Sequence, residues 1–236
     1  MGKTEKIVRI TATALVELFT AATIIMLLIN KQYDRLPLAF ATLLISLVPK
    51  ITEKIFKCKI VLPVYIFMLC YFIGPMLGQC YNLYYIVSWW DKLLHILGGV
   101  VFALFGLYLF RVFAGSGKKK LLFTAIFALC FSMAVSVLWE VAEFSADSLA
   151  GTDMQNDTVV TEINSYLFGE GIGVVGSVEN IKEVVIDGNP LPFNGYIDIG
   201  LNDTMWDLIL EMLGALAVSI IYLIDRGRHP ALVSVT

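Results

Sequence analysis

The sequence predicts an all-α fold, a polytopic membrane bundle of six transmembrane helices with a small external β-hairpin element. Apolar residues make up 58% of the 236 residues and charged residues only 16%, against about 45–50% and 25% in soluble domains. The apolar residues form six blocks of about 20, the length that crosses roughly 30 Å of hydrocarbon as a helix. The blocks lack the alternation of barrel strands.

The six spans are predicted to form a single integral membrane domain over residues 1–236. We expect them at 7–29, 36–56, 60–79, 90–113, 121–148 and 204–224. Each should be helical, because lipid offers no hydrogen-bond partner to an extended backbone. The second span is the weakest, since Pro49 and Lys50 interrupt it, and residues 50–59 could instead lie along the interface.

The basic residues predict the orientation of the spans, because Lys and Arg concentrate on the cytoplasmic side. If both termini are cytoplasmic, 4 basic residues are external (Lys31, Arg35, Lys92, Lys182) and 13 are internal (Lys3, Lys6, Arg9, Lys50, Lys54, Lys57, Lys59, Arg111, Lys118, Lys119, Lys120, Arg226, Arg228). We therefore expect a multi-pass plasma-membrane protein with cytoplasmic termini. The net charge of −3 provides no basic surface for a nucleic acid.

The external segment 149–203 breaks the helical pattern. It carries nine acidic residues and one lysine, Lys182. Between residues 181 and 200, two β-rich stretches flank the turn sequence Asp187-Gly188-Asn189-Pro190, which is typical of a hairpin. The segment is therefore predicted to be an acidic insertion with a small β element.

Ionisable residues follow one face of each of the last three spans. Their spacings are those of neighbours on a helix surface. The residues are Asp91 and His95 in the fourth span, Glu140, Glu143 and Asp147 in the fifth, and Asp203, Asp207 and Glu211 in the sixth. With the predicted orientation all three stripes fall in the outer half of the membrane, so we expect them to converge.

Carboxylates this close together cannot all ionise in a poorly solvated site. Several are therefore protonated, or a cation is bound. Carboxylate oxygens with one imidazole favour Mg²⁺, Mn²⁺ or Ca²⁺ over Zn²⁺. The sequence predicts metal ligands among six residues (Asp91, His95, Glu140, Asp147, Asp203, Asp207) and a general base in Glu143 or Glu211.

A structural interpretation competes with this one. Acids at helix starts complement the helix dipole, and a buried histidine often hydrogen-bonds to a neighbour one turn away, here Asp91. Neither explanation covers Glu140, Asp207 and Glu211, which lie deep in their spans. Glu17, in the middle of the first span, is a separate intramembrane acid expected to face a partner or a cavity.

Three functions follow from an outward-facing polar site. The first is a metal-dependent hydrolase or transferase acting on a lipid headgroup or a lipid-linked envelope precursor. The second is a proton or metal-ion transporter, which is disfavoured because residues 97–110, 121–135 and 212–224, in the inner halves of the last three spans, contain no acid, base or histidine. The third is a non-catalytic binder of a lipid, an antibiotic or a metal.

The same residues carry a family resemblance. The run from Trp90 to His95, the run from Trp139 to Phe144, the GTDMQ stretch ending at Gln155 and the run from Asp203 to Asp207 resemble the YjdF-type bacterial inner-membrane proteins, whose function is unassigned, and more distantly the VanZ-like proteins. The resemblance covers residues 88–216. It implies a bacterial plasma-membrane location and a shared polar centre that includes the acid stripes.

One departure from the family pattern concerns Gln155 and Asp157, two further candidates for the polar site. The long segment 159–202 separates them in sequence from the start of the last span. Whether they lie beside Asp203 and Asp207 is therefore open at the level of sequence.

Overall fold

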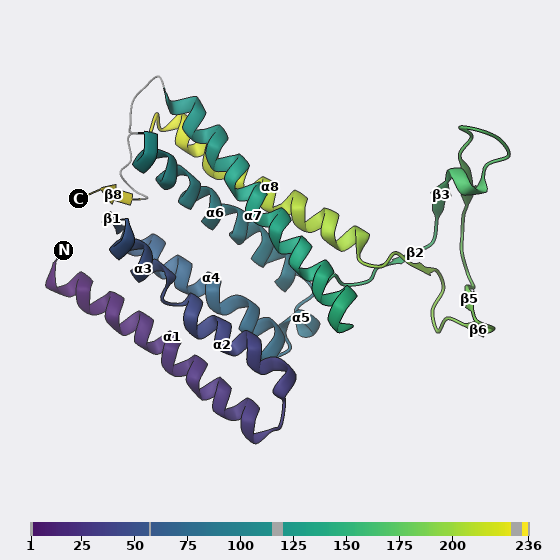
Figure 1. The fold of residues 1–236 in the computed structure, drawn as a ribbon, viewed down its shortest axis with the longest axis horizontal. Helices are drawn as coiled ribbons and strands as arrows, with labels where there is room; N and C mark the ends of the chain where they lie inside the picture. Colours follow the sequence, from purple (N-terminus) through teal and green to yellow (C-terminus); the bar gives the residue numbers. More distant parts are fainter. Residues whose placement is uncertain (1, 57, 115–119, 228–232, 236) are drawn as a thin grey trace. The chain divides into compact units, whose positions relative to one another are not determined.

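The computed structural model describes residues 2–56, 58–114, 120–227 and 233–235 (Figure 1). Lys57, Lys118, Lys119 and Arg228, which entered the charge count, lie outside this part. The described chain has six helices or helical segments long and apolar enough to cross a membrane: Lys3–Ile29, Tyr33–Ile55, Leu62–Cys80, Trp90–Ala114, Leu121–Ala150 and Leu201–Ile224. The predicted helical membrane bundle is confirmed, with each span within a few residues of its expected position.

The second span is divided, as Pro49 suggested. A 3-10 turn, η1 (Tyr33–Arg35), leads into α2 (Leu36–Ile45), and α3 (Val48–Ile55) follows after two residues. Pro49 lies in the first turn of α3, where its missing N–H needs no partner. The interruption is therefore a break just before Pro49. The alternative that residues 50–59 lie along the interface stays a prediction.

The chain forms two compact units, which we call the bundle unit and the loop unit. The bundle unit comprises residues 1–136 and 209–236, and the loop unit comprises residues 137–208. The boundaries fall inside two helices, α7 (Leu121–Ala150) and α8 (Leu201–Ile224), which both continue from one unit into the other.

The first half of the bundle unit packs α1 (Lys3–Ile29) against α2 and α4 (Leu62–Cys80), and α4 against α6 (Trp90–Ala114) (Figure 1). Leu27, Ala39 and Met76 form a fully buried cluster between α1, α2 and α4. A short helix, α5 (Leu83–Ile86), joins α4 to α6. At the opposite end, β1 (Cys58–Ile60) pairs antiparallel with β8 (Val233–Val235).

Small residues bring α6, α7 and α8 together in the second half of the bundle unit. Ala103, Ala128 and Ala215, one from each helix, are fully buried in one cluster. The Ser132 hydroxyl donates to the carbonyl of Gly99, and the Ser219 hydroxyl donates to the carbonyl of Ala125. Helices in lipid associate through close packing of small residues and through hydrogen bonds between helices, because the hydrophobic effect does not favour their association there.

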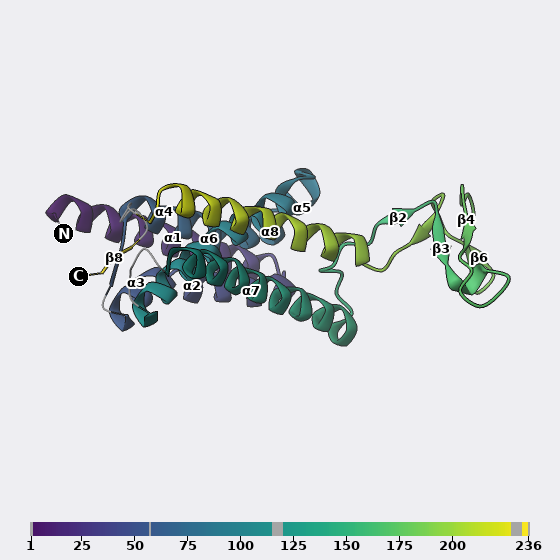
Figure 2. The same ribbon diagram turned by 90° about the horizontal axis from the view of Figure 1, so that it is seen from above.

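The loop unit contains three short antiparallel ladders between the end of α7 and the start of α8 (Figure 2). The pairs are β2 (Val159–Val160) with β7 (Tyr196–Ile197), β3 (Ile163–Ser165) with β4 (Gly176–Val178), and β5 (Val185–Ile186) with β6 (Asn189–Pro190). A 3-10 turn, η3 (Tyr166–Phe168), follows β3.

The hairpin predicted around Asp187 and Gly188 is confirmed by the pairing of β5 with β6. Both turn residues have positive φ, 49° and 76°, as a type I′ turn requires. The strand β7 pairs with β2, far away in sequence, rather than extending this hairpin. That ladder and the one between β3 and β4 were not predicted, because strands of two or three residues carry too little alternation to recognise.

Candidate metal centre

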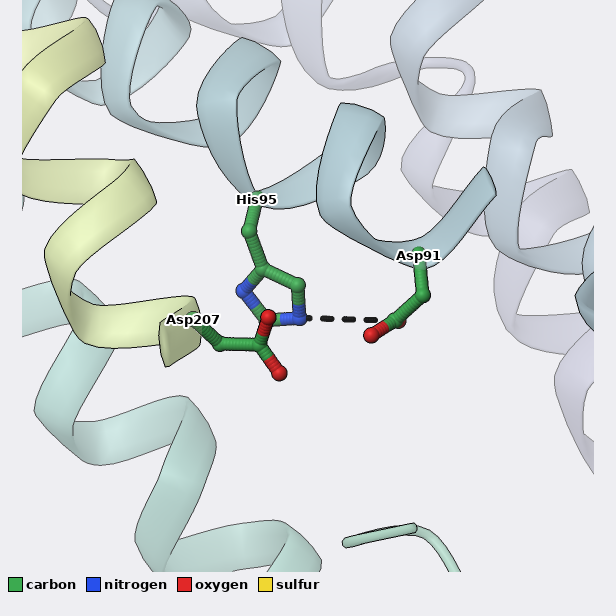
Figure 3. Close-up of side chains that lie close together, drawn as sticks. All are labelled: Asp91, His95 and Asp207. Atoms are coloured by element: carbon green, nitrogen blue, oxygen red, sulfur yellow. Dashed lines mark ion pairs between the residues drawn. The ribbon is translucent and has the colours of Figure 1, made fainter. Parts of the chain in front are cut away.

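A buried histidine lies between two carboxylates in the bundle unit. Helix α6 places Asp91 one turn before His95, and Asp91 Oδ1 lies 3.6 Å from His95 Nε2 (Figure 3). From α8, Glu211 Oε1 lies 3.8 Å from His95 Nδ1. His95 is 7% exposed and Glu211 4%. Each ring nitrogen therefore faces a carboxylate of its own.

Glycine allows α6 and α8 to approach closely enough for this contact. A Cβ atom added at Gly99 would collide with the carbonyl oxygen of Glu211, and one added at Gly214 would collide with the carbonyl oxygen of Ile96. The two helices are therefore in backbone contact directly beside His95. Glycine at such positions permits packing distances that no other residue allows.

Tyr71 of α4 is a further polar group beside Glu211, and the sequence analysis missed it. A Cβ atom added at Gly98 would lie 2.8 Å from both Tyr71 Oη and Glu211 Oε1. These two oxygens therefore share one side of α6. The available signal was Pro75, four residues after Tyr71 inside an apolar helix, because a proline there removes the hydrogen-bond donor for the Tyr71 carbonyl and marks irregular packing.

Two contacts fix the start of α6. The Trp90 indole N–H donates to the carbonyl of Gly74 at 3.2 Å, which ties the first residue of α6 to α4. Lys92 Nζ lies 3.5 Å from Asp91 Oδ2. Asp91 thus directs one oxygen towards a lysine and the other towards the imidazole.

The geometry around His95 fits a cation. A neutral imidazole has one N–H donor and one lone pair, so one of the two carboxylates faces a lone pair unless the ring is protonated or a cation lies between. The 3.6 Å between Nε2 and Asp91 Oδ1 exceeds an N–H···O hydrogen bond. It is close to the roughly 3.3–3.4 Å that separates two ligands of a tetrahedral ion with ligand distances of about 2.0–2.1 Å.

Asp207 belongs to the same helical face as Glu211. Helix α8 is continuous from Leu201 to Ile224, so Asp207 precedes Glu211 by one turn, as Asp91 precedes His95. Asp207 is 1% exposed. Asp91, His95 and Asp207 each offer one ligand atom to a metal ion (Figure 3).

The acids of α7 belong to the loop unit. Glu140 and Glu143 are both buried. They continue the face of α7 that carries Ser132 and Ser136. Their predicted roles, a metal ligand for Glu140 and a general base for Glu143, stay predictions.

Asp147 and Asp203 accept hydrogen bonds from the loop that follows α7. The two oxygens of Asp147 accept hydrogen bonds from the Thr152 hydroxyl and from the backbone N–H groups of Met154 and Gln155, at 2.7–2.9 Å. Asp203 accepts from the backbone N–H of Asn156 at 2.9 Å. Both carboxylates thus shape this loop, and their predicted role as metal ligands stays untested.

Gln155 does lie at the start of α8. Its side-chain N–H donates to the Thr204 hydroxyl at 2.5 Å. The long segment 159–202 therefore leaves Gln155 beside this helix, because the pairing of β2 with β7 closes the segment at its base.

Asp157 lies in an acidic environment of the loop unit. Partial burial raises its pKa above the ordinary value, and the negative charges of Asp153 and Asp198 add to this shift. Asp198 behaves differently. Partial burial raises its pKa, but hydrogen bonds from the backbone of Thr158 and Asn202 outweigh burial, so that its pKa lies below the ordinary value.

A model of a known protein family matches residues 11–228. The chain belongs to the family described as "Predicted membrane protein (DUF2238)". The match covers all or most of every candidate span. Neither the curated proteins nor the solved structures contain a match to this chain.

The bundle unit has a second buried charged cluster, which the sequence analysis also missed. Arg9 of α1 is 5% exposed. Its guanidinium donates to Glu53 at 2.7 Å, to Glu5 at 2.8 and 3.2 Å, and to the carbonyl of Ile60. Its carbon lies 4.8 Å from the centre of the Tyr65 ring, as a cation–π contact. We call this set the Arg9 cluster.

Proposed function

We propose that this membrane protein binds a divalent cation between α6 and α8, with His95 Nε2, Asp91 and Asp207 as ligands. The observation that carries the proposal is the buried imidazole between two carboxylates, on two helices held in backbone contact. Buried carboxylates are costly in a membrane span unless a cation compensates them. A bound ion would supply that compensation.

The ligand set favours ions that accept both nitrogen and oxygen. Imidazole suits Zn²⁺, and carboxylates suit Mg²⁺, Ca²⁺ and Mn²⁺. With the three proposed protein ligands, the ion would keep open positions for water and substrate, as catalytic sites do.

We further propose that the ion serves a hydrolase or transferase reaction on a lipid headgroup or a lipid-linked envelope substrate. Asp91 is the second residue of α6, so the proposed site begins near one end of a span, where a lipid headgroup could reach it. A bound ion would polarise a phosphoryl or carbonyl oxygen and lower the pKa of a bound water. Glu143 would take the proton from that water.

The location we propose is a bacterial plasma membrane with both termini cytoplasmic. The resemblance to YjdF-type and VanZ-like proteins supports the membrane, and the distribution of Lys and Arg supports the orientation. Under this orientation the cation site opens to the outer side, where a lipid-linked envelope substrate would be reached.

Metal analysis of the purified protein tests the cation site. The protein is incubated separately with Mg²⁺, Mn²⁺, Ca²⁺ and Zn²⁺ and freed of unbound ion. We expect about one ion per chain in the wild type and a loss of the ion in Asp207→Asn. The matched control is Asp34→Asn, the same change on a side chain that is 76% exposed, and it should retain the ion. If none of the four ions is retained by the wild type, the proposal is wrong.

Turnover separates the enzyme from the non-catalytic binder. The probe is dioleoyl phosphatidic acid in mixed micelles, with released inorganic phosphate as the readout. Ion-dependent release that Asp207→Asn and Glu143→Gln both abolish supports a lipid phosphate hydrolase. Stoichiometric ion binding without release favours the binder.

A further inference from the structure

We propose that Glu211 is a positioning residue that accepts the Nδ1 proton of His95 and so directs the Nε2 lone pair to the cation. This inference rests on the proposed function. The sequence analysis made Glu211 a candidate general base, but its place beside the imidazole favours a different role.

The two ring nitrogens have different neighbours. Glu211 Oε1 is the carboxylate oxygen near Nδ1, at 3.8 Å, and Asp91 Oδ1 is the one near Nε2, at 3.6 Å. The in-plane directions of the two ring nitrogens diverge, so one ion cannot bind at both. With a cation at Nε2 beside Asp91, Glu211 is left facing the opposite edge of the ring.

A ligating histidine usually donates its other N–H to a carboxylate, a carbonyl or water, which fixes the tautomer and the ring orientation. Glu211 has the chemistry for this task. Its side chain is 4% exposed, and among the described residues its second oxygen, Oε2, has no hydrogen-bond partner. A buried carboxylate with one unpartnered oxygen can rotate to close the remaining gap to Nδ1.

Tyr71 supports Glu211 from α4. A point 2.8 Å from Glu211 Oε1 is also 2.8 Å from Tyr71 Oη, at the position where Gly98 has no side chain. The hydroxyl can donate to the carboxylate, whereas a side chain at residue 98 would displace both groups. In this arrangement Tyr71 would hold Glu211, Glu211 would orient His95, and His95 would bind the cation.

The tautomer of His95 can be observed by NMR without overlap, because the protein contains just one other histidine, His229, which can be replaced. In the variant His229→Gln, ¹⁵N-labelled histidine reports on His95 alone. At a pH where the ring is neutral, we expect Nδ1 to be protonated and Nε2 to be unprotonated in the metal-free protein, and the Nε2 resonance to move when Zn²⁺ is added. In Glu211→Gln both tautomers should be populated.

Affinity gives the second readout. Competition with a Zn²⁺ indicator should show about 10- to 100-fold weaker binding in Glu211→Gln and a smaller loss in Tyr71→Phe. The matched control is Glu17→Gln, the same change at another intramembrane acid of the bundle unit, which should leave both readouts unchanged.

The outcomes separate the inference from the proposed function. If no variant binds an ion but the Nδ1 tautomer is present and depends on Glu211, the cation site is wrong while the contact between Glu211 and His95 stands. If the ion binds but the wild type has its proton on Nε2, or Glu211→Gln retains full affinity, the positioning role is wrong and the cation site stands.

Discussion

The bundle unit contains two buried charged regions, and they are built differently. In the Arg9 cluster one guanidinium meets Glu5 and Glu53 through hydrogen bonds of 2.7–3.2 Å, and Glu53 also accepts from the backbone of Ile60 at 2.9 Å. Around His95 the carboxylate contacts are 3.6 and 3.8 Å long. The charged groups of the Arg9 cluster are thus within hydrogen-bond distance of one another, whereas the carboxylates around His95 lie beyond hydrogen-bond distance of the ring nitrogens.

The two regions also differ in charge balance. Lys59 lies 3.4 Å from Glu5, so the Arg9 cluster has two cations for two carboxylates. Around His95 the bundle unit supplies two carboxylates, Asp91 and Glu211, against one lysine, Lys92. A neutral set with short hydrogen bonds is what a structural ion pair requires. An acidic set with longer separations is what a cation site requires.

The largest expected effect is in the Arg9 cluster. Arg9→Met should destabilise the protein by about 1.5–3 kcal/mol, because Glu53 and the carbonyl of Ile60 lose their charged hydrogen-bond donor, and it should leave ion content unchanged. Thermal unfolding in detergent measures this. The control is Lys6→Met, the replacement of another basic residue by Met at an exposed position of α1. If Arg9→Met instead removed the bound ion at unchanged stability, the two regions would not be independent.

A smaller effect is expected where α6 meets α8. Gly99→Ala should cost about 1–3 kcal/mol of stability, because overpacking forces the backbone apart, and should also weaken ion binding. At the neighbouring residue, Gly98→Ala meets only the ends of two side chains, so it should weaken ion binding at a lower cost in stability. Thermal unfolding and ion retention are measured for both variants. Equal stability of Gly99→Ala and Gly98→Ala would contradict this prediction.

The smallest effect is expected at a carboxylate outside both regions. Asp198 has a pKa below its ordinary value, because hydrogen bonds from Thr158 and Asn202 to the ionised form outweigh its partial burial. Its contribution to stability is therefore present above the unfolded value, about 4, and is lost as the pH falls through the lower folded value.

Hydrogen exchange of the Thr158 and Asn202 amides, followed from pH 6 down to about pH 2, measures this contribution. The wild type should lose protection in the acidic part of this range. Asp198→Asn should show weaker protection that does not change with pH. If protection of these amides depended on pH equally in the wild type and in Asp198→Asn, a group other than Asp198 would be responsible.

Sequence patterns identified the spans well, because each needs about 20 apolar residues and little else. The hairpin at Asp187 and Gly188 was equally visible, since positive φ at two successive residues favours few sequences. The ladder between β2 and β7 was not, because Val159 and Ile197 are brought together by tertiary structure alone. Of the acid stripes, helical spacing correctly indicated the contact between Asp91 and His95.

The amino-acid sequence alone determined that this is a helical membrane protein with acids at one end of its last spans, because apolar length and helical periodicity are local properties. The tertiary structure decided which side chains meet. Arg9 looked like one of many topology-setting basic residues until the fold placed Glu53 beside it, and Tyr71 looked like an ordinary aromatic residue. Glu211 reaches His95 because glycines let two backbones touch, and a contact between distant segments depends on packing that no local pattern encodes.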